Sequence, residues 1–237
     1  MREKKLRDRE RIFAAEGDHL CGEISALDNK IPLFAYTEKA AEKYPDTVEK
    51  MLERAEQCII ITEEVSEYIS DTSSPQGMFA AAEMRDNFIP AEAERVIILD
   101  GVSDPGNVGT IIRTAEALGF DGMITLGDSA DIYSPKTLRA SMGSAFRFPV
   151  IHTSSEELDN ILRGFTLYAA MLDSSAQKLG EIVFDGKSAF VIGNEARGVS
   201  PQTAEHCHRK LYIPIVKAES LNAAIAAAII MAASKGL

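Results

Sequence analysis

The sequence predicts an α/β protein with two domains, and three observations support this. Apolar segments of strand length alternate with helical segments along the chain. In the C-terminal part, segments such as VIIL at 96–99 and AFVIG at 189–193 are apolar without alternation, as in parallel strands covered on both faces. Between the two parts, residues 86–93 mix charge with a proline, which is typical of a linker.

The N-terminal part, residues 1–85, predicts a small α/β layer domain. Its first 11 residues are highly charged and favour a solvated helix, with a contact to RNA as the alternative. The periodicity predicts strands at 12–15, 31–36, 58–61 and 77–82, and helices at 18–27, 38–44, 46–53 and 63–69.

Residues 94–237 predict a larger domain with a parallel sheet and flanking helices. We expect strands near 95–100, 122–126, 148–151, 166–171, 189–193 and 211–214, and helices near 108–118, 135–143, 155–163, 201–207 and 221–234.

A polar turn follows the first strand of this domain. It carries Asp104, Pro105, Gly106 and Asn107, and the next helix is expected to begin near Val108, with Arg113 in its second turn. Proline and glycine suit a sharp strand-to-helix connection. Polar side chains at such a turn lie at the carboxyl edge of a sheet, where open α/β folds bind ligands.

Two later segments have a similar character. In FVIGNEARGVS at 190–200, an apolar strand ends at Gly193 and is followed by Asn194, Glu195 and Arg197. In residues 211–233, a short strand ends at Pro214, and Ser220-Leu221-Asn222 then opens an alanine-rich helix.

With these three motifs in order, the chain resembles the SpoU/TrmH-type RNA 2′-O-ribose methyltransferases of the SPOUT superfamily. The resemblance covers 94–237 well and extends more weakly to 11–17 and 70–80 in the N-terminal part. It implies a parallel-sheet SPOUT domain with a C-terminal trefoil knot, preceded by a small α/β RNA substrate-binding domain. It also implies a homodimer formed through the C-terminal domain.

The resemblance implies S-adenosylmethionine (AdoMet) as cofactor and no metal. Gly193, Asn194, Ile213 and Leu221 match the positions that contact AdoMet in the family. Core packing is the alternative role of Ile213 and Leu221. A bulky residue at Gly193 is expected to block the pocket while the fold stays intact.

The catalytic set implied by the resemblance is led by Arg113. A ribose 2′-hydroxyl is too weak an acid to ionise at neutral pH, so transfer depends on positioning and on stabilising the developing alkoxide. A guanidinium stays protonated and suits that stabilising role better than the role of a base. Arg113 is expected to reach back to the turn at Asn107. The remaining members of the set are Asn107, Glu195, Ser220 and Asn222.

Structural alternatives exist for these polar residues. Glu195 also suits a structural salt bridge, and Ser220 suits the N-cap of the last helix. The chain departs from the family pattern at Ala196, where glycine is common, and at 216–219, where the loop is shorter and has no glycine.

Charge argues in part against RNA binding, because the net charge is −11 and the pI is near 4.9. Residues 133–148 nevertheless contain three basic residues and no acidic one, and they predict a local RNA-binding surface made by Lys136, Arg139 and Arg147.

Three cysteines without paired spacing indicate a reducing compartment, and no apolar leader or membrane span is present, so we expect a cytoplasmic protein. The segment HCHRK at 206–210 offers too few ligands for zinc.

The sequence therefore predicts an AdoMet-dependent RNA ribose 2′-O-methyltransferase, with ribosomal RNA favoured over transfer RNA. The first alternative is a non-catalytic RNA-binding or assembly protein that retains the fold. The second is a small nucleotide-binding enzyme, which the absence of GxGxxG and of a P-loop lysine disfavours.

Overall fold

The computed structural model describes residues 3–237, and these form two compact units. The first unit comprises Met1–Asp86 together with Tyr133–Arg147, and the second comprises Asn87–Ile132 together with Phe148–Leu237. The segment 133–147 was expected inside the C-terminal domain, whereas its contacts place it in the first unit.

The first unit is built on a four-stranded sheet with the order β1-β4-β2-β3. Strand β4 runs antiparallel to β1 and β2, and β3 runs parallel to β2. Its elements are α1 (Lys4–Glu10), β1 (Ile12–Glu16), α2 (Asp18–Ser25), β2 (Leu33–Tyr36), α3 (Glu38–Lys43), α4 (Pro45–Arg54), β3 (Cys58–Ile60), α5 (Glu63–Ile69), β4 (Met78–Glu83), α7 (Pro135–Ser141) and the 3₁₀ helix η1 (Ser144–Phe146).

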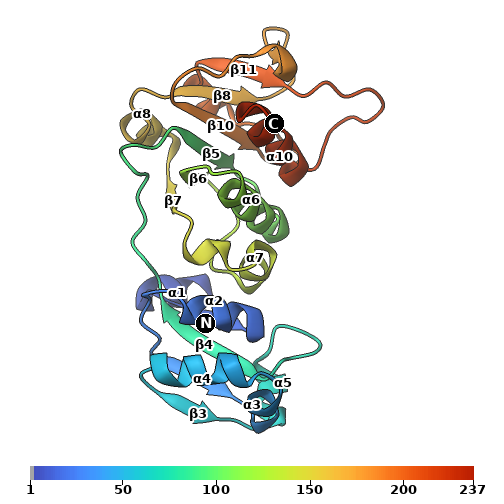
Figure 1. Cartoon of the computed structure of the whole chain (residues 1–237). Coiled ribbons are helices and arrows are strands. Elements are labelled where there is room, and N and C mark those ends of the chain that lie inside the picture. Colours follow the sequence, from blue (N-terminus) through green and yellow to red (C-terminus); the bar gives the residue numbers. More distant parts are fainter. Residues whose placement is uncertain (1–2) are drawn as a thin grey trace. The chain divides into compact units, whose positions relative to one another are not determined.

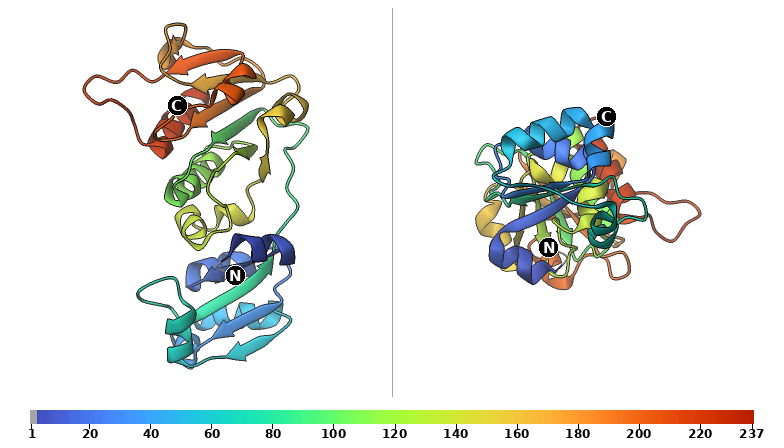
Figure 2. Two further views of the ribbon diagram at one scale, coloured as in Figure 1. Left: turned by 180° about the vertical axis from the view of Figure 1, so that it is seen from behind. Right: turned by 90° about the horizontal axis from the view of Figure 1, so that it is seen from below.

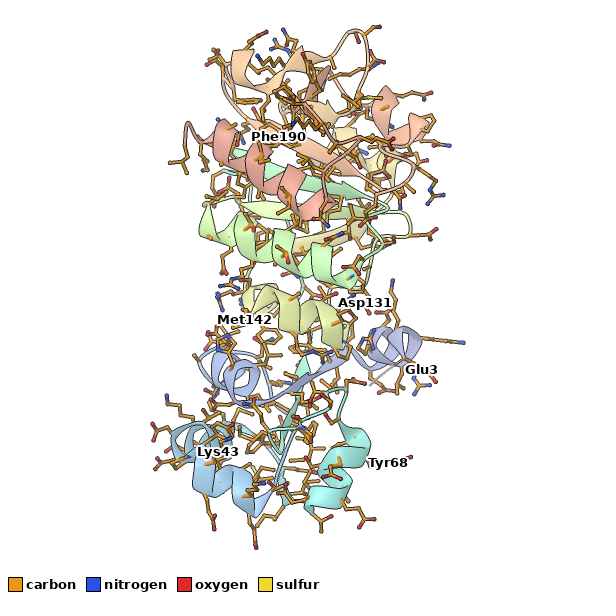
Figure 3. The ribbon with its side chains drawn as sticks, turned by 90° about the vertical axis from the view of Figure 1, so that its right-hand side faces the viewer. Glu3, Lys43, Tyr68, Asp131, Met142 and Phe190 are labelled. Atoms are coloured by element: carbon orange, nitrogen blue, oxygen red, sulfur yellow. The ribbon has the colours of Figure 1, made fainter. Side chains whose placement is uncertain are left out.

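The two faces of this sheet differ. Phe13, Phe34 and Met78 point to one face and are at most 1% exposed. The alternate positions, such as Ala14 and Phe79, point to the other face and are only half-buried. Helices α4 and α5 lie on opposite sides of the strands (Figure 3). We call the face that carries Phe13, Phe34 and Met78 the covered face, and the face that carries Ala14 and Phe79 the open face.

The segment 133–147 completes the core of the first unit. The rings of Tyr133 and Phe146 stack against Phe13 with centroid distances of 5.0 and 5.2 Å. Arg147 forms an ion pair with Glu23 of α2. These contacts explain why a segment far along the sequence belongs to the N-terminal unit.

The second unit is built on a seven-stranded sheet with the order β7-β6-β5-β10-β8-β11-β9, and every pair in it is parallel (Figure 1). Its elements are β5 (Arg95–Asp100), α6 (Pro105–Ala117), β6 (Gly122–Leu126), β7 (Val150–Thr153), η2 (Ser155–Glu157), α8 (Leu158–Ile161), β8 (Thr166–Ala170), β9 (Gln177–Lys178), η3 (Leu179–Glu181), β10 (Ser188–Gly193), α9 (Pro201–Glu205), β11 (Arg209–Tyr212) and α10 (Ala223–Ser234).

Both faces of the seven-stranded sheet are covered. On one face Val96, Ile98 and Val191 pack in a cluster with Leu158 of α8. On the other, α6 and α10 lie side by side, and the fully buried Phe190 contacts Phe120, Tyr168 and Phe184 (Figures 1 and 3). Burial on both faces accounts for the continuous apolar character of these strands.

The expected elements are present, with shifted boundaries. Helix α6 begins at Pro105 instead of near 108, because the side chain of Asp104 caps it by accepting a hydrogen bond from the backbone N–H of Asn107. The helix expected at 155–163 is divided into η2 and the short α8. Strand β9 was not expected. The loop between β11 and α10 stands away from the sheet (Figure 2).

Within the described part of the chain, no helix is both long enough and apolar enough to cross a membrane.

Candidate active site

The first two motifs leave the sheet side by side. Strands β5 and β10 are paired, with Asp100 opposite Gly193, so the turn after β5 and the loop after β10 start at the same carboxyl edge. The side-chain amide of Asn194 donates a 2.7 Å hydrogen bond to the carbonyl of Gly101 and joins the two loops. This is the sheet edge at which the sequence predicts a site.

The loop after β10 is compact and depends on glycine. Asn194 and Gly198 exchange backbone hydrogen bonds of 3.0 and 2.9 Å, and the side chain of Asn194 accepts from the backbone N–H groups of Ala196 and Arg197. A Cβ on Gly193 would lie 2.1 Å from the carbonyl carbon of Gly198. The expectation that a bulky residue at 193 leaves the fold intact is therefore wrong, because the backbone of the same loop fills that space.

Three side chains, one from each motif, form a hydrogen-bonded chain. Asn107 donates to Glu195 at 2.8 Å, and Asn222 donates to the side-chain oxygen of Asn107 at 2.9 Å. Because a carboxylate can only accept, Glu195 fixes the orientation of the Asn107 amide. The three motifs are thus connected by two side-chain hydrogen bonds.

Glu195 is held in its ionised form. Partial burial raises its pKa, but hydrogen bonds from Asn107 and from backbone N–H groups, including that of Ser103, outweigh this and leave the pKa below its ordinary value. Glu195 therefore acts as a charged hydrogen-bond acceptor at neutral pH, and a salt bridge is not its role within the described residues.

The third motif differs from expectation in its cap. Asn222, not Ser220, is the N-cap of α10, and its side chain accepts hydrogen bonds from the amides of Ala224 and Ile225 at 2.9 and 3.3 Å. Ser220 is exposed and lies beside the pocket described next. One side chain, Asn222, thus starts the last helix and joins it to Asn107.

A pocket of about 390 Å³ lies where the loops after β10 and β11 meet the start of α10. Its volume is in the range of small-molecule sites. All four residues predicted to contact AdoMet line this pocket: Gly193, Asn194, Ile213 and Leu221. Glu195 and Ser220 line it as well.

Other lining residues were not predicted. Met171 and Leu172 follow β8, and Tyr212 and Ile215 flank the predicted Ile213. The position of β8 between β10 and β11 places its carboxyl end at the pocket, and this strand order cannot be read from periodicity.

Arg113 does not take the expected position. It lies in the third turn of α6 because the helix starts at Pro105, and it is not among the residues that line the pocket. It is six positions after Asn107, which corresponds to roughly 240° around the helix axis. The two side chains therefore leave α6 in different directions. Arg113 is exposed, and among residues 3–237 its guanidinium has no hydrogen-bond or ion-pair partner.

The three basic residues predicted to bind RNA all belong to the first unit. Lys136 is exposed on α7, Arg139 is half-buried, and Arg147 forms the ion pair with Glu23.

The side chains of HCHRK serve structural contacts. His206 contacts Asp159 at 3.0 Å, and His208 accepts a hydrogen bond from the Leu167 amide. Within the part of the chain that the structure describes, no group of three His, Cys, Asp or Glu side chains is arranged to hold a metal ion.

Two family models match the chain. Residues 94–232 match the SpoU rRNA Methylase family, and residues 1–80 match the MRM3-like substrate binding domain.

Similar proteins and structures cover 75% to 99% of the chain. The 23S rRNA (guanosine(2553)-2′-O)-methyltransferase RlmP of Bacillus subtilis is 34% identical over 231 residues, which is 96% of this chain and 90% of that protein. A 23S rRNA (uridine(2479)-2′-O)-methyltransferase of Streptomyces viridochromogenes is 33% identical over 75% of this chain and 66% of that protein. The AdoMet-bound rRNA methyltransferase of Sinorhizobium meliloti has a TM-score of 0.87 and 31% identity, over 99% of this chain and 90% of that one.

Proposed function

The chain belongs to the SpoU rRNA methylase family, and on that premise we propose that it transfers a methyl group from AdoMet to a ribose 2′-hydroxyl of ribosomal RNA. The observation that carries the proposal is the hydrogen-bonded chain Glu195–Asn107–Asn222, which joins all three motifs beside one pocket. The acidic composition and the shorter loop at 216–219 were the support for the non-catalytic alternative. It is disfavoured because the related proteins include rRNA methyltransferases.

The pocket fits the cofactor. AdoMet is the cofactor of the family, and it supplies an electrophilic methyl group on a sulfonium. The lining combines apolar side chains, Ile213 and Leu221, with backbone groups at Gly193 and Asn194, as adenosine and a methionine chain require. Glu195 stays ionised beside the pocket and suits the binding of a positively charged ligand.

The nucleophile has to be positioned and its developing charge stabilised. We assign stabilisation of the 2′-oxygen to Arg113, whose guanidinium has no partner among the described residues. Because Arg113 leaves α6 in a direction different from Asn107, we further propose that it completes the pocket of a second copy of the chain.

The second copy is proposed to pack against α6 and α10. Apolar side chains are exposed there, with Ile225 at 52% and Ile229 at 37% exposure, and Val216 in the adjoining loop at 92%. Burial of these side chains in a homodimer would remove apolar surface from water.

The substrate is proposed to be ribosomal RNA in preference to transfer RNA, because both named relatives act on 23S rRNA. They modify different nucleotides, so the position in the RNA is not transferred. Lys136 remains the proposed phosphate contact of the first unit, and Arg147 is available only when its pair with Glu23 opens. Arg139 is half-buried and lines a hollow together with Glu16 and Asp71, so it is not assigned to RNA. Three free cysteines support a cytoplasmic location.

A mixing experiment tests the assignment of Arg113. Arg113→Ala keeps a pocket and lacks the guanidinium, whereas Leu221→Asp keeps the guanidinium and has a damaged pocket. If Arg113 acts on the partner's pocket, mixed dimers regain methyl transfer to ribosomal RNA although each variant alone is inactive. No recovery in dimers shown to be mixed by mass spectrometry would refute the action across chains. No methyl incorporation by the unaltered protein into unmodified ribosomal RNA would refute the enzymatic function itself.

A further inference from the structure

The open face of the four-stranded sheet carries a hollow that the catalytic function does not use. Three alanines and Phe79 form its floor: Ala14 pairs with Ala81 across β1 and β4, and Ala35 pairs with Phe79 across β2 and β4. Residues of α5 and α7 border the floor and enclose about 590 Å³. Every residue of this hollow belongs to the first unit.

The hollow continues into an exposed apolar surface. Ile59 of β3 is 44% exposed, and Val65 and Tyr68 of α5 are 42% and 84% exposed. Tyr68 projects outward from α5 (Figure 3). On the covered face, Phe13, Phe34 and Met78 are each at most 1% exposed. Contiguous exposed apolar surface of this kind marks interaction sites.

The charge around the hollow is predominantly negative. Its charged lining residues are Glu16, Asp71 and one cation, Arg139. Helix α5 adds three exposed carboxylates, at Glu63, Glu64 and Glu67. RNA brings one negative charge with each nucleotide and would be repelled here. The same carboxylates attract a ligand that carries Lys or Arg.

We propose that the open face docks an amphipathic segment of a protein partner. Apolar side chains of that segment fill the hollow above Ala14, Ala35 and Ala81. Its Lys or Arg residues lie against the carboxylates of α5. This is the helix-in-groove mode of recognition, with charge complementarity selecting the partner. The proposal is independent of the methyl-transfer site.

Fluorescence anisotropy tests the proposal with defined probes on the full chain. The probes are a labelled amphipathic peptide of about 15 residues built from Leu and Lys, the same peptide with Glu in place of Lys, and a short single-stranded RNA. We expect the Lys peptide to bind with a micromolar dissociation constant and the Glu peptide to bind at least about 10-fold more weakly.

Two variants locate the binding. Ala81→Trp fills the hollow, and Glu63→Lys/Glu64→Lys/Glu67→Lys reverses the charge of α5. Each is expected to weaken binding of the Lys peptide by about 10-fold or more. The matched controls are Ala26→Trp, at an exposed position, and Glu49→Lys/Glu53→Lys on α4, and they are expected to change it less than about 2-fold. If Ala81→Trp fails to fold by circular dichroism, Val65→Asp on the exposed side of α5 replaces it.

Three results would overturn the proposal. The first is an affinity for the Lys peptide that none of the open-face variants changes. The second is RNA binding that Ala81→Trp abolishes, which would make RNA the occupant. The third is a dimer that Ala81→Trp dissociates in sedimentation, which would make a second copy the occupant. AdoMet affinity, measured by calorimetry, should be the same in all variants.

Discussion

In the seven-stranded sheet both faces are covered, and the polar residues of the site lie at one edge; in the four-stranded sheet one face stays open and apolar. Helices cover both sides of the parallel strands, so only the strand ends are left for chemistry. In the four-stranded sheet, α5 and α7 border a hollow on the open face without filling it. The two units thus present their binding surfaces differently: one at the edge of a sheet, the other on a face.

Of the changes at the sheet-edge site of the second unit, removal of the Arg113 guanidinium should have the largest effect on methyl transfer. We expect Arg113→Ala to lower single-turnover methyl transfer by about 100-fold or more, because it removes stabilisation that acts mainly in the transition state. AdoMet affinity should stay within about 2-fold, since Arg113 does not line the pocket. Arg113→Lys should restore little, because an ammonium lacks the planar fork. Arg163→Ala, another exposed arginine of the same unit, is the control. Near-normal transfer by Arg113→Ala would exclude this role.

Gly193→Ala tests whether the site at the sheet edge depends on the close approach of the Gly193 and Gly198–Val199 backbones. The added methyl group meets the Gly198–Val199 backbone, so we expect a loss of about 1–3 kcal/mol in the free energy of unfolding together with weaker AdoMet binding. Gly180→Ala is the matched control, because nothing lies within 4 Å of a Cβ there. Differential scanning fluorimetry and calorimetry measure the two effects. Equal melting temperatures of the two variants would contradict the packing argument.

Asn222 combines two roles that substitutions can separate. Asn222→Ala removes the cap of α10 and should lower the free energy of unfolding by about 1 kcal/mol. Asn222→Asp keeps an acceptor for the cap but loses the donor to Asn107. We expect Asp to preserve stability and still weaken AdoMet binding. If Asp binds AdoMet as well as Asn, the link to Asn107 has no part in forming the pocket.

The smallest expected effect concerns pH. Because the pKa of Glu195 is lowered in the folded protein, its ionised form stabilises the fold above the ordinary value of 4.5, and this contribution is lost as the pH falls through the lower folded value. The difference in melting temperature between the unaltered protein and Glu195→Gln should be constant above about pH 5 and shrink below it. A difference that grows on acidification would reverse the assigned direction.

The sequence predicted the edge site better than the open face, for physical reasons. Strands with continuous apolar character and loops rich in Gly and Asn are local signals, and they indicated the edge of the sheet. The family resemblance assigned Gly193, Asn194, Ile213 and Leu221 to AdoMet, and all four line one pocket. The orientation of Arg113 depends on where α6 begins, and the cap at Asp104 moved that start toward the N-terminus.

The open face could not be predicted from local pattern. Its floor is formed by alanines and Phe79 from three different strands, and their pairing is known only once the strand order is known. The helix cap at Asn222 was missed because Ser and Asn are equally good N-caps and stand two positions apart. The trefoil knot remains a prediction from the resemblance.

The assignment of 133–147 to the first unit has a consequence for synthesis of the chain. Phe13 cannot bury its ring between Tyr133 and Phe146 until the ribosome has passed residue 147. Elongation at roughly 5–20 residues per second leaves the nascent N-terminal unit incomplete for several seconds. During that interval the ring of Phe13 lacks its two stacking partners, and the open face lacks the residues of α7 that border its hollow. A chain stopped or cleaved after 86–93 would keep them so, which makes the linker an unsuitable place to divide this protein for expression.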